Sequence, residues 1–337
     1  MKKSLIALAV AGALATPMIA QADATLYGSF RVVLENADGQ DLNLRDDSTR
    51  IGIKGDVDLG LENTKGLFHW EANLSTADSN QFGASTNAAN NGLSGKGKSM
   101  FGERLSYLGA TGPWGTALVG RQYHPHYLWI NLGSTGAGVL NSLVASAGEW
   151  GFLGNQSDGA VSHKRVDNTV AYISPVMNGF QFIGGAVVAG TGDDSADDVD
   201  GYNVAAKYHA NGLTLAASFA EVDAIDRELL GLSAKYTTGA LTLAARYEDR
   251  EVGTSIDSDV IEVSGAYKVA DNTKVTLRFT QKEVNDVEGE LWAAAVERTM
   301  GKGRIFAEIY EFDSGAESSA TEMNASDRVL IGYRVDF

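Results

Sequence analysis

The sequence predicts an all-β protein, a sixteen-stranded antiparallel transmembrane β-barrel that forms a single domain. Three observations predict it. Short segments alternate apolar and polar residues, the connections between them alternate in length, and the last segment alternates up to a terminal aromatic residue. Beyond the N-terminal segment, no stretch of the 337 residues holds the ~18 uninterrupted apolar residues that a membrane helix needs.

The alternating segments each have one apolar face and one polar face. In 239–251, Leu241, Leu243 and Tyr247 alternate with Thr242 and Arg246. Side chains two residues apart share a face of a strand, so such a strand separates two different environments. Strands are predicted near 24–35, 49–60, 66–77, 99–112, 115–123, 165–174, 179–190, 200–210, 212–222, 226–238, 239–251, 257–270, 272–285, 288–301, 302–313 and 327–337.

The connections alternate between short turns and longer polar segments. Short turn signals stand at 112–115, 178–179, 210–212, 238–239, 271–272 and 301–303, and longer connections at 36–48, 78–98, 124–164, 191–200, 252–257 and 314–326. Bacterial outer-membrane barrels have short periplasmic turns and long external loops, so this rhythm favours such a barrel.

The N-terminal segment is typical of a secretory signal peptide. Lys2 and Lys3 precede the apolar stretch 5–15, and Ala20-Gln21-Ala22 has the small-residue pattern of a cleavage site. The predicted division is a signal peptide over 1–22 and a barrel domain over 23–337, exported to the cell outer membrane.

Composition excludes several classes of function. The formal net charge of −16 argues against a nucleic-acid partner bound through a basic face. The chain has no cysteine, which excludes disulfides and thiol catalysis. It contains neither G-x-S-x-G nor H-E-x-x-H, and His124 and His126 flank Pro125 in a way that suits a loop entry. We expect no enzyme activity, no cofactor and no metal site.

Aromatic residues beside the short turns predict an interfacial girdle, because amphipathic rings favour the boundary between membrane and water. They are Tyr172, Phe180, Tyr208, Tyr236 and Tyr267. Two segments alternate poorly. Trp292 and Arg298 share parity in 288–301, and Phe306 shares parity with Arg304 and Glu308 in 302–313. Either these strands pack on both faces, or a bulge interrupts them.

Four stretches resemble the trimeric general porins of Gram-negative bacteria. They are Leu26-Tyr27-Gly28, the stretch 50–55, Gly120-Arg121-Gln122-Tyr123 and the closing strand that ends on Phe337. The resemblance covers essentially the whole mature chain. It implies a homotrimer in outer-membrane lipid, each subunit forming a water-filled channel for passive diffusion of ions and small polar solutes. It also implies a third loop folded into the barrel.

The connection 124–164 is the longest and the candidate for that inward loop. Loops of this length are uncommon unless they are functional. Leu140, Leu143, Trp150 and Phe152 would gain nothing in water but would gain from packing inside the barrel wall. The alternative is an external lid.

Parity places basic side chains in the lumen. Arg50 and Lys54 lie opposite Ile51 and Ile53, Arg31 opposite Phe30 and Val32, and Arg104 opposite Leu105 and Tyr107. The resemblance implies an arginine cluster on the wall facing carboxylates on the loop. Arg50, Arg104 and Arg165 match wall positions, Glu149 matches the loop carboxylate, and Asp158 is a looser candidate. A second acid found in many relatives is replaced by the stretch Ala145-Ser146.

Selectivity and substrate remain open at this point. Aspartates crowd the connections 36–48 and 191–200; they would concentrate cations at a mouth, whereas arginines at the waist favour anions. The rival function is a substrate-specific channel, for which Tyr123, Tyr127 and Trp129 could form an aromatic slide. The other interpretation of these rings is that they pack the loop against the wall. A structural or adhesive barrel would need fewer strands and a plugged interior.

Overall fold

The computed structural model describes residues 23–74, 101–132, 165–188, 198–222, 226–254, 256–313, 315 and 327–337. The predicted signal peptide and most of the connection 124–164 lie outside these residues. No helix within the described ranges is long and apolar enough to cross a membrane.

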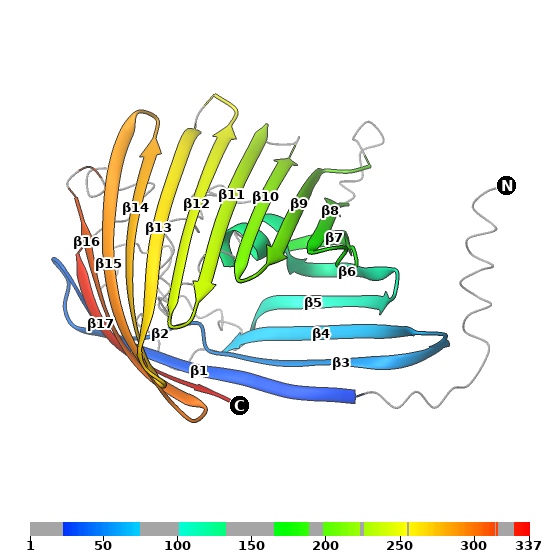
Figure 1. Ribbon diagram of the computed structural model, residues 1–337, viewed down its shortest axis with the longest axis horizontal. Helices are drawn as coiled ribbons and strands as arrows, with labels where there is room; N and C mark the ends of the chain where they lie inside the picture. The colour runs from blue at the N-terminus through cyan, green and yellow to red at the C-terminus, as the bar shows by residue number, and fades with distance from the viewer. Residues whose placement is uncertain are drawn as a thin grey trace, which may run out of the picture.

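The described chain forms one antiparallel sheet that closes on itself (Figure 1). Its strands are β1 (Asp23–Ala37), β2 (Asn43–Asp46), β3 (Arg50–Leu61), β4 (Thr64–Leu74), β5 (Phe101–Gly112), β6 (Gly115–Tyr123), β7 (Arg165–Ile173), β8 (Phe180–Val187), β9 (Gly201–Ala210), β10 (Leu213–Val222), β11 (Arg227–Thr238), β12 (Leu241–Val252), β13 (Ile256–Ala270), β14 (Thr273–Val284), β15 (Val287–Met300), β16 (Gly303–Phe312) and β17 (Arg328–Asp336).

Seventeen strands occupy sixteen positions around the barrel. β1 pairs with β3 over Asp23–Ser29 and with β2 over Val32–Glu35, so β2 and β3 share one side of β1. On its other side β1 pairs with β17, which closes the ring. The prediction of a sixteen-stranded antiparallel barrel is therefore confirmed. β2 alone was missed, because Asn43–Asp46 lies within the polar connection that was predicted as a loop.

The outer surface carries an apolar belt bordered by aromatic rings. Leucine, valine and isoleucine side chains point outward on the strands from β5 to β17, among them Leu108, Leu277 and Ile331. The five predicted girdle residues lie at the ends of strands beside the short turns, and four of them are exposed by 45% or more. A barrel edge lined in this way matches a boundary between membrane and water.

The two poorly alternating strands contain no bulge. In β15, Trp292 and Arg298 both point outward, and the ladders to β14 and β16 run without a register shift. Arg298 lies near the turn 301–302, where a long cationic side chain can reach water beside the membrane. In β16, Phe306 and Glu308 are both buried and point inward.

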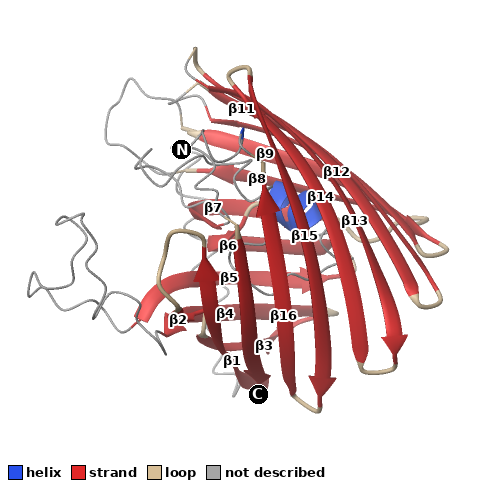
Figure 2. Cartoon of the chain, turned by 90° about the vertical axis from the view of Figure 1, so that its left-hand side faces the viewer, coloured by secondary structure: helices blue, strands red, loops and turns tan. Residues whose placement is uncertain are grey.

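The inside of the barrel is packed with apolar groups at two places. Phe306, Tyr310, Leu330 and Val33 form one cluster across β16, β17 and β1. The second surrounds a short helical turn, η1 (Tyr127–Asn131), which packs on the inner face of β10 and β11. Figure 2 shows η1 behind the strands of the front wall, within the ring. The start of the third loop is therefore folded inward, as predicted.

Candidate functional site

Two of the four predicted wall arginines, Arg50 and Arg104, converge on one carboxylate that was not predicted from the sequence. Glu71 of β4 accepts a hydrogen bond from Arg104 Nε at 2.5 Å, and its other oxygen lies 3.9 Å from Arg50 Nε. Arg31 stands next to them, because its Nε donates to Ser29 Oγ and Ser29 is the register partner of Arg50. Glu71 alternates with Trp70 and Ala72, so the same parity argument would have placed it in the lumen.

Arg104 points inward because of a β-bulge, which the alternation of residues along the strand did not predict. The ladder between β4 and β5 shifts register, with Glu71 opposite Leu105 and Ala72 opposite Glu103. Arg104 is thus the extra residue of a β-bulge, and a bulge re-aims a side chain. Leu105 is buried and Tyr107 contacts His69 inside the barrel. The expectation that Leu105 and Tyr107 face away from Arg104 is wrong, whereas Arg104 itself does face the lumen.

A polar network extends from Glu71 toward the short turns. The Tyr27 hydroxyl donates to Glu71 Oε2 at 2.8 Å and lies 2.6 Å from His69 Nε2. His69 Nδ1 lies 2.9 Å from the Tyr107 hydroxyl. Lys54 Nζ stands 5.1 Å from the centre of the Tyr27 ring, a cation–π distance. These groups place hydrogen-bonding side chains on the wall between the arginines and the short turns.

Arg165 lies where the third loop returns to the wall. It is the cross-strand partner of Tyr123, and its guanidinium stands 5.0 Å from the centre of that ring. Tyr123 in turn stacks on Tyr127 at 5.1 Å. The structure therefore places Arg165 at the loop entry, against Tyr123. The two loop acids, Glu149 and Asp158, lie outside the described residues.

A row of three arginines crosses the closing seam of the barrel. Arg31 of β1 is opposite Arg334 of β17, which is opposite Arg304 of β16. Asp336 lies 2.7 Å from Arg334 Nε and 3.5 Å from Arg304 Nη2. Like charges directly opposite each other destabilise a sheet, and Asp336 offsets part of this repulsion through its contacts with Arg334 and Arg304. The sequence analysis placed only Arg31 in it.

A second basic wall faces the lumen on β11 to β14. Arg246 donates to Glu262 at 2.9 Å, and Arg278 Nε lies 3.6 Å from the same carboxylate. Arg227, Arg250 and Lys282 are also nearly fully buried on this inner face. The alternation in 239–251 and 272–285 places Arg246, Arg250, Arg278 and Lys282 on the polar face, so the signal was present, but the predicted wall arginines all lie on β1 to β7.

One of the three aromatic residues at the loop entry, Trp129, packs against the barrel wall. Trp129 is buried against Ile183, Ala205 and Ala216 of the wall, and Lys207 Nζ stands 4.6 Å from its ring centre. Of the two interpretations, packing against the wall therefore holds for Trp129.

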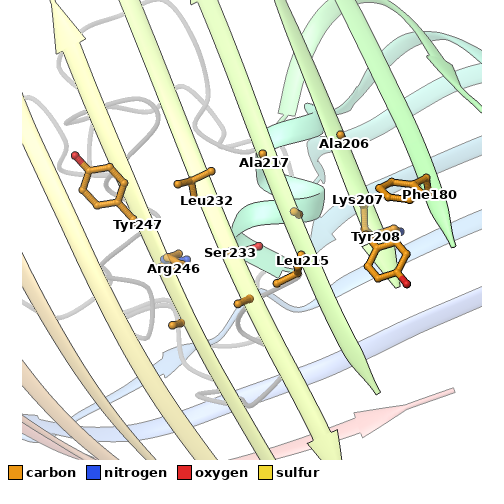
Figure 3. Close-up of a pocket in the computed structure, with 13 residues that line it drawn as sticks. Phe180, Ala206, Lys207, Tyr208, Leu215, Ala217, Leu232, Ser233, Arg246 and Tyr247 are labelled. Atoms are coloured by element: carbon orange, nitrogen blue, oxygen red, sulfur yellow. The ribbon is translucent and has the colours of Figure 1, made fainter. Parts of the chain in front are cut away.

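A hollow of about 610 Å³ opens on the outside of the barrel (Figure 3). It exists because Ala206, Ala217, Ala234 and Ala245 leave room between the larger Leu215, Leu232, Tyr208 and Tyr247. Among the described residues no group of three or more His, Asp and Glu side chains could hold a metal ion.

Comparison with known proteins agrees with this geometry. The sequence pattern of the Gram-negative porin family matches residues 7–322. The major outer membrane protein P.IB of Neisseria gonorrhoeae is 30% identical over 227 residues, which cover 63% of this chain and 55% of that protein. The chain thus spans about half the length of the curated relatives it matches.

Two solved structures share the fold at low sequence identity. The anion-selective porin from Comamonas acidovorans superposes with a TM-score of 0.70 at 17% identity, covering 94% of this chain and all of that one. The trimer form of OmpT of Vibrio cholerae gives a TM-score of 0.65 at 18% identity, covering 94% and 99%. The chain belongs to the Gram-negative porin family, and its transmembrane barrel places it in the outer membrane.

Proposed function

We propose that this protein is an outer-membrane porin whose lumen is a water-filled channel for passive diffusion of ions and small hydrophilic solutes. The observation that carries the proposal is a closed barrel with sixteen strand positions and an interior lined by charged side chains. Barrels of this size leave an aqueous channel. The family is one of channels rather than enzymes, which supports the same conclusion.

The constriction in this proposal lies between the arginine wall and the third loop. Arg31, Arg50, Arg104 and Arg165 line the wall side, and Glu149 and Asp158 are the candidate carboxylates of the loop side. Support comes from the convergence of Arg50 and Arg104 on Glu71 and from the docking of the loop entry across the lumen.

The channel prefers anions in this proposal. The arginine row of β16, β17 and β1 and the basic wall of β11 to β14 line both sides of the lumen, although the whole chain has a net charge of −16. Basic side chains that border the path of an ion attract anions. The Comamonas acidovorans neighbour, described as anion-selective, supports this direction.

The proposed assembly is a homotrimer in outer-membrane lipid. Support comes from the exposed apolar belt, which needs lipid or another subunit to cover it, and from the trimer form of the Vibrio cholerae neighbour.

Single-channel recording in a planar bilayer tests the proposal. Large ohmic openings grouped in threes are expected, and a salt gradient should give a reversal potential of the sign for anion preference. A potential of the opposite sign would overturn the anion preference. Small openings blocked by one particular solute would instead favour the substrate-specific channel.

A further inference from the structure

We infer that Glu248 and Gly231 are positioning residues that hold the start of the third loop, residues 126–131, against the inner wall, so that strands β11 and β12 determine the aperture of the pore. The inference rests on the proposed channel function. The role assigned to Glu248 and Gly231 is to hold the loop in place, which the wall arginines do not do. The loop leaves the wall at Tyr123 of β6, yet its first turn docks on β9 to β12.

The inner face of the wall is built to receive this turn. Along β8 to β11 several inward positions are small, among them Ala205, Ala216 and Gly231. Ile130 is fully buried and Trp129 is 8% exposed against this surface. Burying two such side chains contributes to docking in proportion to the apolar area removed from water.

Gly231 forms a notch for one loop side chain. A Cβ placed on Gly231 would lie 2.3 Å from His126 Cε1 and 3.0 Å from Ile130 Cγ1. A carbon atom cannot be accommodated at 2.3 Å, so any residue larger than glycine would displace the His126 ring or the turn that follows it. His126 has no exposed surface, which leaves its ring little space to move.

Glu248 is the polar centre of the docking contact. Its Oε1 accepts a hydrogen bond from Asn131 Nδ2, lies 3.4 Å from His126 Nε2 and lies 3.7 Å from Arg246 Nε. One buried carboxylate thus joins both ends of η1 to the wall. Removing one partner of a buried charged contact is strongly unfavourable, because the remaining groups lose their compensation.

Two backbone contacts fix the orientation of the turn. The His126 N–H donates to Asn203 Oδ1 at 2.6 Å, and Ser233 Oγ donates to the Trp129 carbonyl at 3.2 Å. Asn203 is itself held by Ser218 and the Phe219 carbonyl. Strands β9, β10, β11 and β12 therefore all contribute to holding a loop that belongs to β6 and β7.

Thiol accessibility tests docking directly, because the chain has no cysteine of its own. In the full-length trimer, Ile130→Cys should be protected from a water-soluble thiol reagent, whereas Lys54→Cys in the exposed lumen should react. Adding Glu248→Ala or Gly231→Val to Ile130→Cys should expose the thiol. Protection that survives both changes, or reaction of Ile130→Cys alone, would overturn the inference.

Two control variants test whether removing another buried lumen carboxylate, or adding a Cβ at another glycine, also exposes the thiol. Glu262→Gln removes a buried lumen carboxylate that contacts Arg246 and Arg278 but no residue of η1, so Ile130→Cys should stay protected. Gly185→Ala adds a Cβ whose nearest contacts are 3.6–3.7 Å, and it should also preserve protection. Exposure of the thiol in either control would contradict the specific role of Glu248 and Gly231.

The number of conductance levels in single-channel recordings then tests whether docking of the loop determines the aperture of the pore. Glu248→Ala and Gly231→Val should replace the single conductance level by several levels, whereas Glu248→Gln should retain one level because its carbonyl still accepts from Asn131. An unchanged single level in a variant whose thiol is exposed would show that docking does not determine the aperture. Unboiled gel mobility verifies that each barrel is folded, and thiol protection does not depend on the channel proposal being correct.

Discussion

The carboxylate of Glu71 joins the bulge arginine Arg104 on one side and the Tyr27 hydroxyl on the other, at 2.5 and 2.8 Å. Both Glu71 and Arg104 are about 5% exposed. The pair therefore holds an arginine in the lumen that regular strand alternation would not have placed beside Leu105.

Glu71→Ala should destabilise the barrel by about 3–5 kcal/mol, because it leaves the buried Arg104 guanidinium without its ion-pair partner. The denaturation midpoint of the refolded protein measures this effect. Glu71→Gln should cost less, since its amide oxygen can still accept one hydrogen bond. Equal stability of the two variants and the unaltered protein would contradict the role of Glu71.

Arg334→Ala should shift the reversal potential toward cations, because it removes one positive charge from the row that Arg31 and Arg304 complete. Arg298→Ala is the matched control, since that arginine points outward from β15. We expect no shift for the control. A shift of the same size in both variants would mean that the lumen row has no special influence on permeating ions.

Glu149→Gln should raise anion preference if this residue faces the wall arginines as the family resemblance implies. The measurement is the reversal potential in a salt gradient, with Asp158→Asn examined in parallel to compare the two loop acids. An unchanged potential after the Glu149 substitution would remove Glu149 from the constriction.

Gly332→Val should destabilise the closing seam by about 1–3 kcal/mol through overpacking. A Cβ on Gly332 would lie 2.0 Å from Phe306 Cζ, and the ring is buried on all sides. Gly184→Ala is the control, because its Cβ would meet only Val204 at 3.8 Å. Thermal unfolding followed by gel mobility should show a lower midpoint for Gly332→Val alone.

Most of the fold could be predicted from the sequence because a barrel strand carries its own periodic signal. Each of the sixteen predicted segments overlaps a strand, and the short turns lie where glycine and asparagine permit positive φ angles, as at Asn211 and Gly212. β2 was missed because four residues in an acidic connection give no periodic pattern. Its pairing depends on β1 having a free edge beyond Ser29, which is a property of the closed sheet.

The site was less predictable, for two physical reasons. The bulge at Arg104 changes parity within one strand, and parity is the only basis on which the sequence orients a side chain. The docking of η1 joins residues 126 and 131 to residue 248, and the pattern of small inward residues on β8 to β11 becomes interpretable only once a partner is known. By contrast, Arg246 and Arg278 followed regular alternation and could have been assigned to the lumen.

The pairing of β1 with β17 also bears on how the protein can be assembled. Gly28 and Phe337 exchange backbone hydrogen bonds, so the first strand completes its ladder only against β17 and the residue that follows it. A chain shortened by one strand would keep two open edges whose N–H and C=O groups cannot be left bare in lipid. Because the partners stand at opposite ends of the sequence, closure is the most non-local step in the whole structure. Biogenesis therefore has to protect an unclosed sheet from aggregation until β17 has been synthesised and exported, and products that lack β17 should be cleared as misfolded protein instead of persisting as smaller pores.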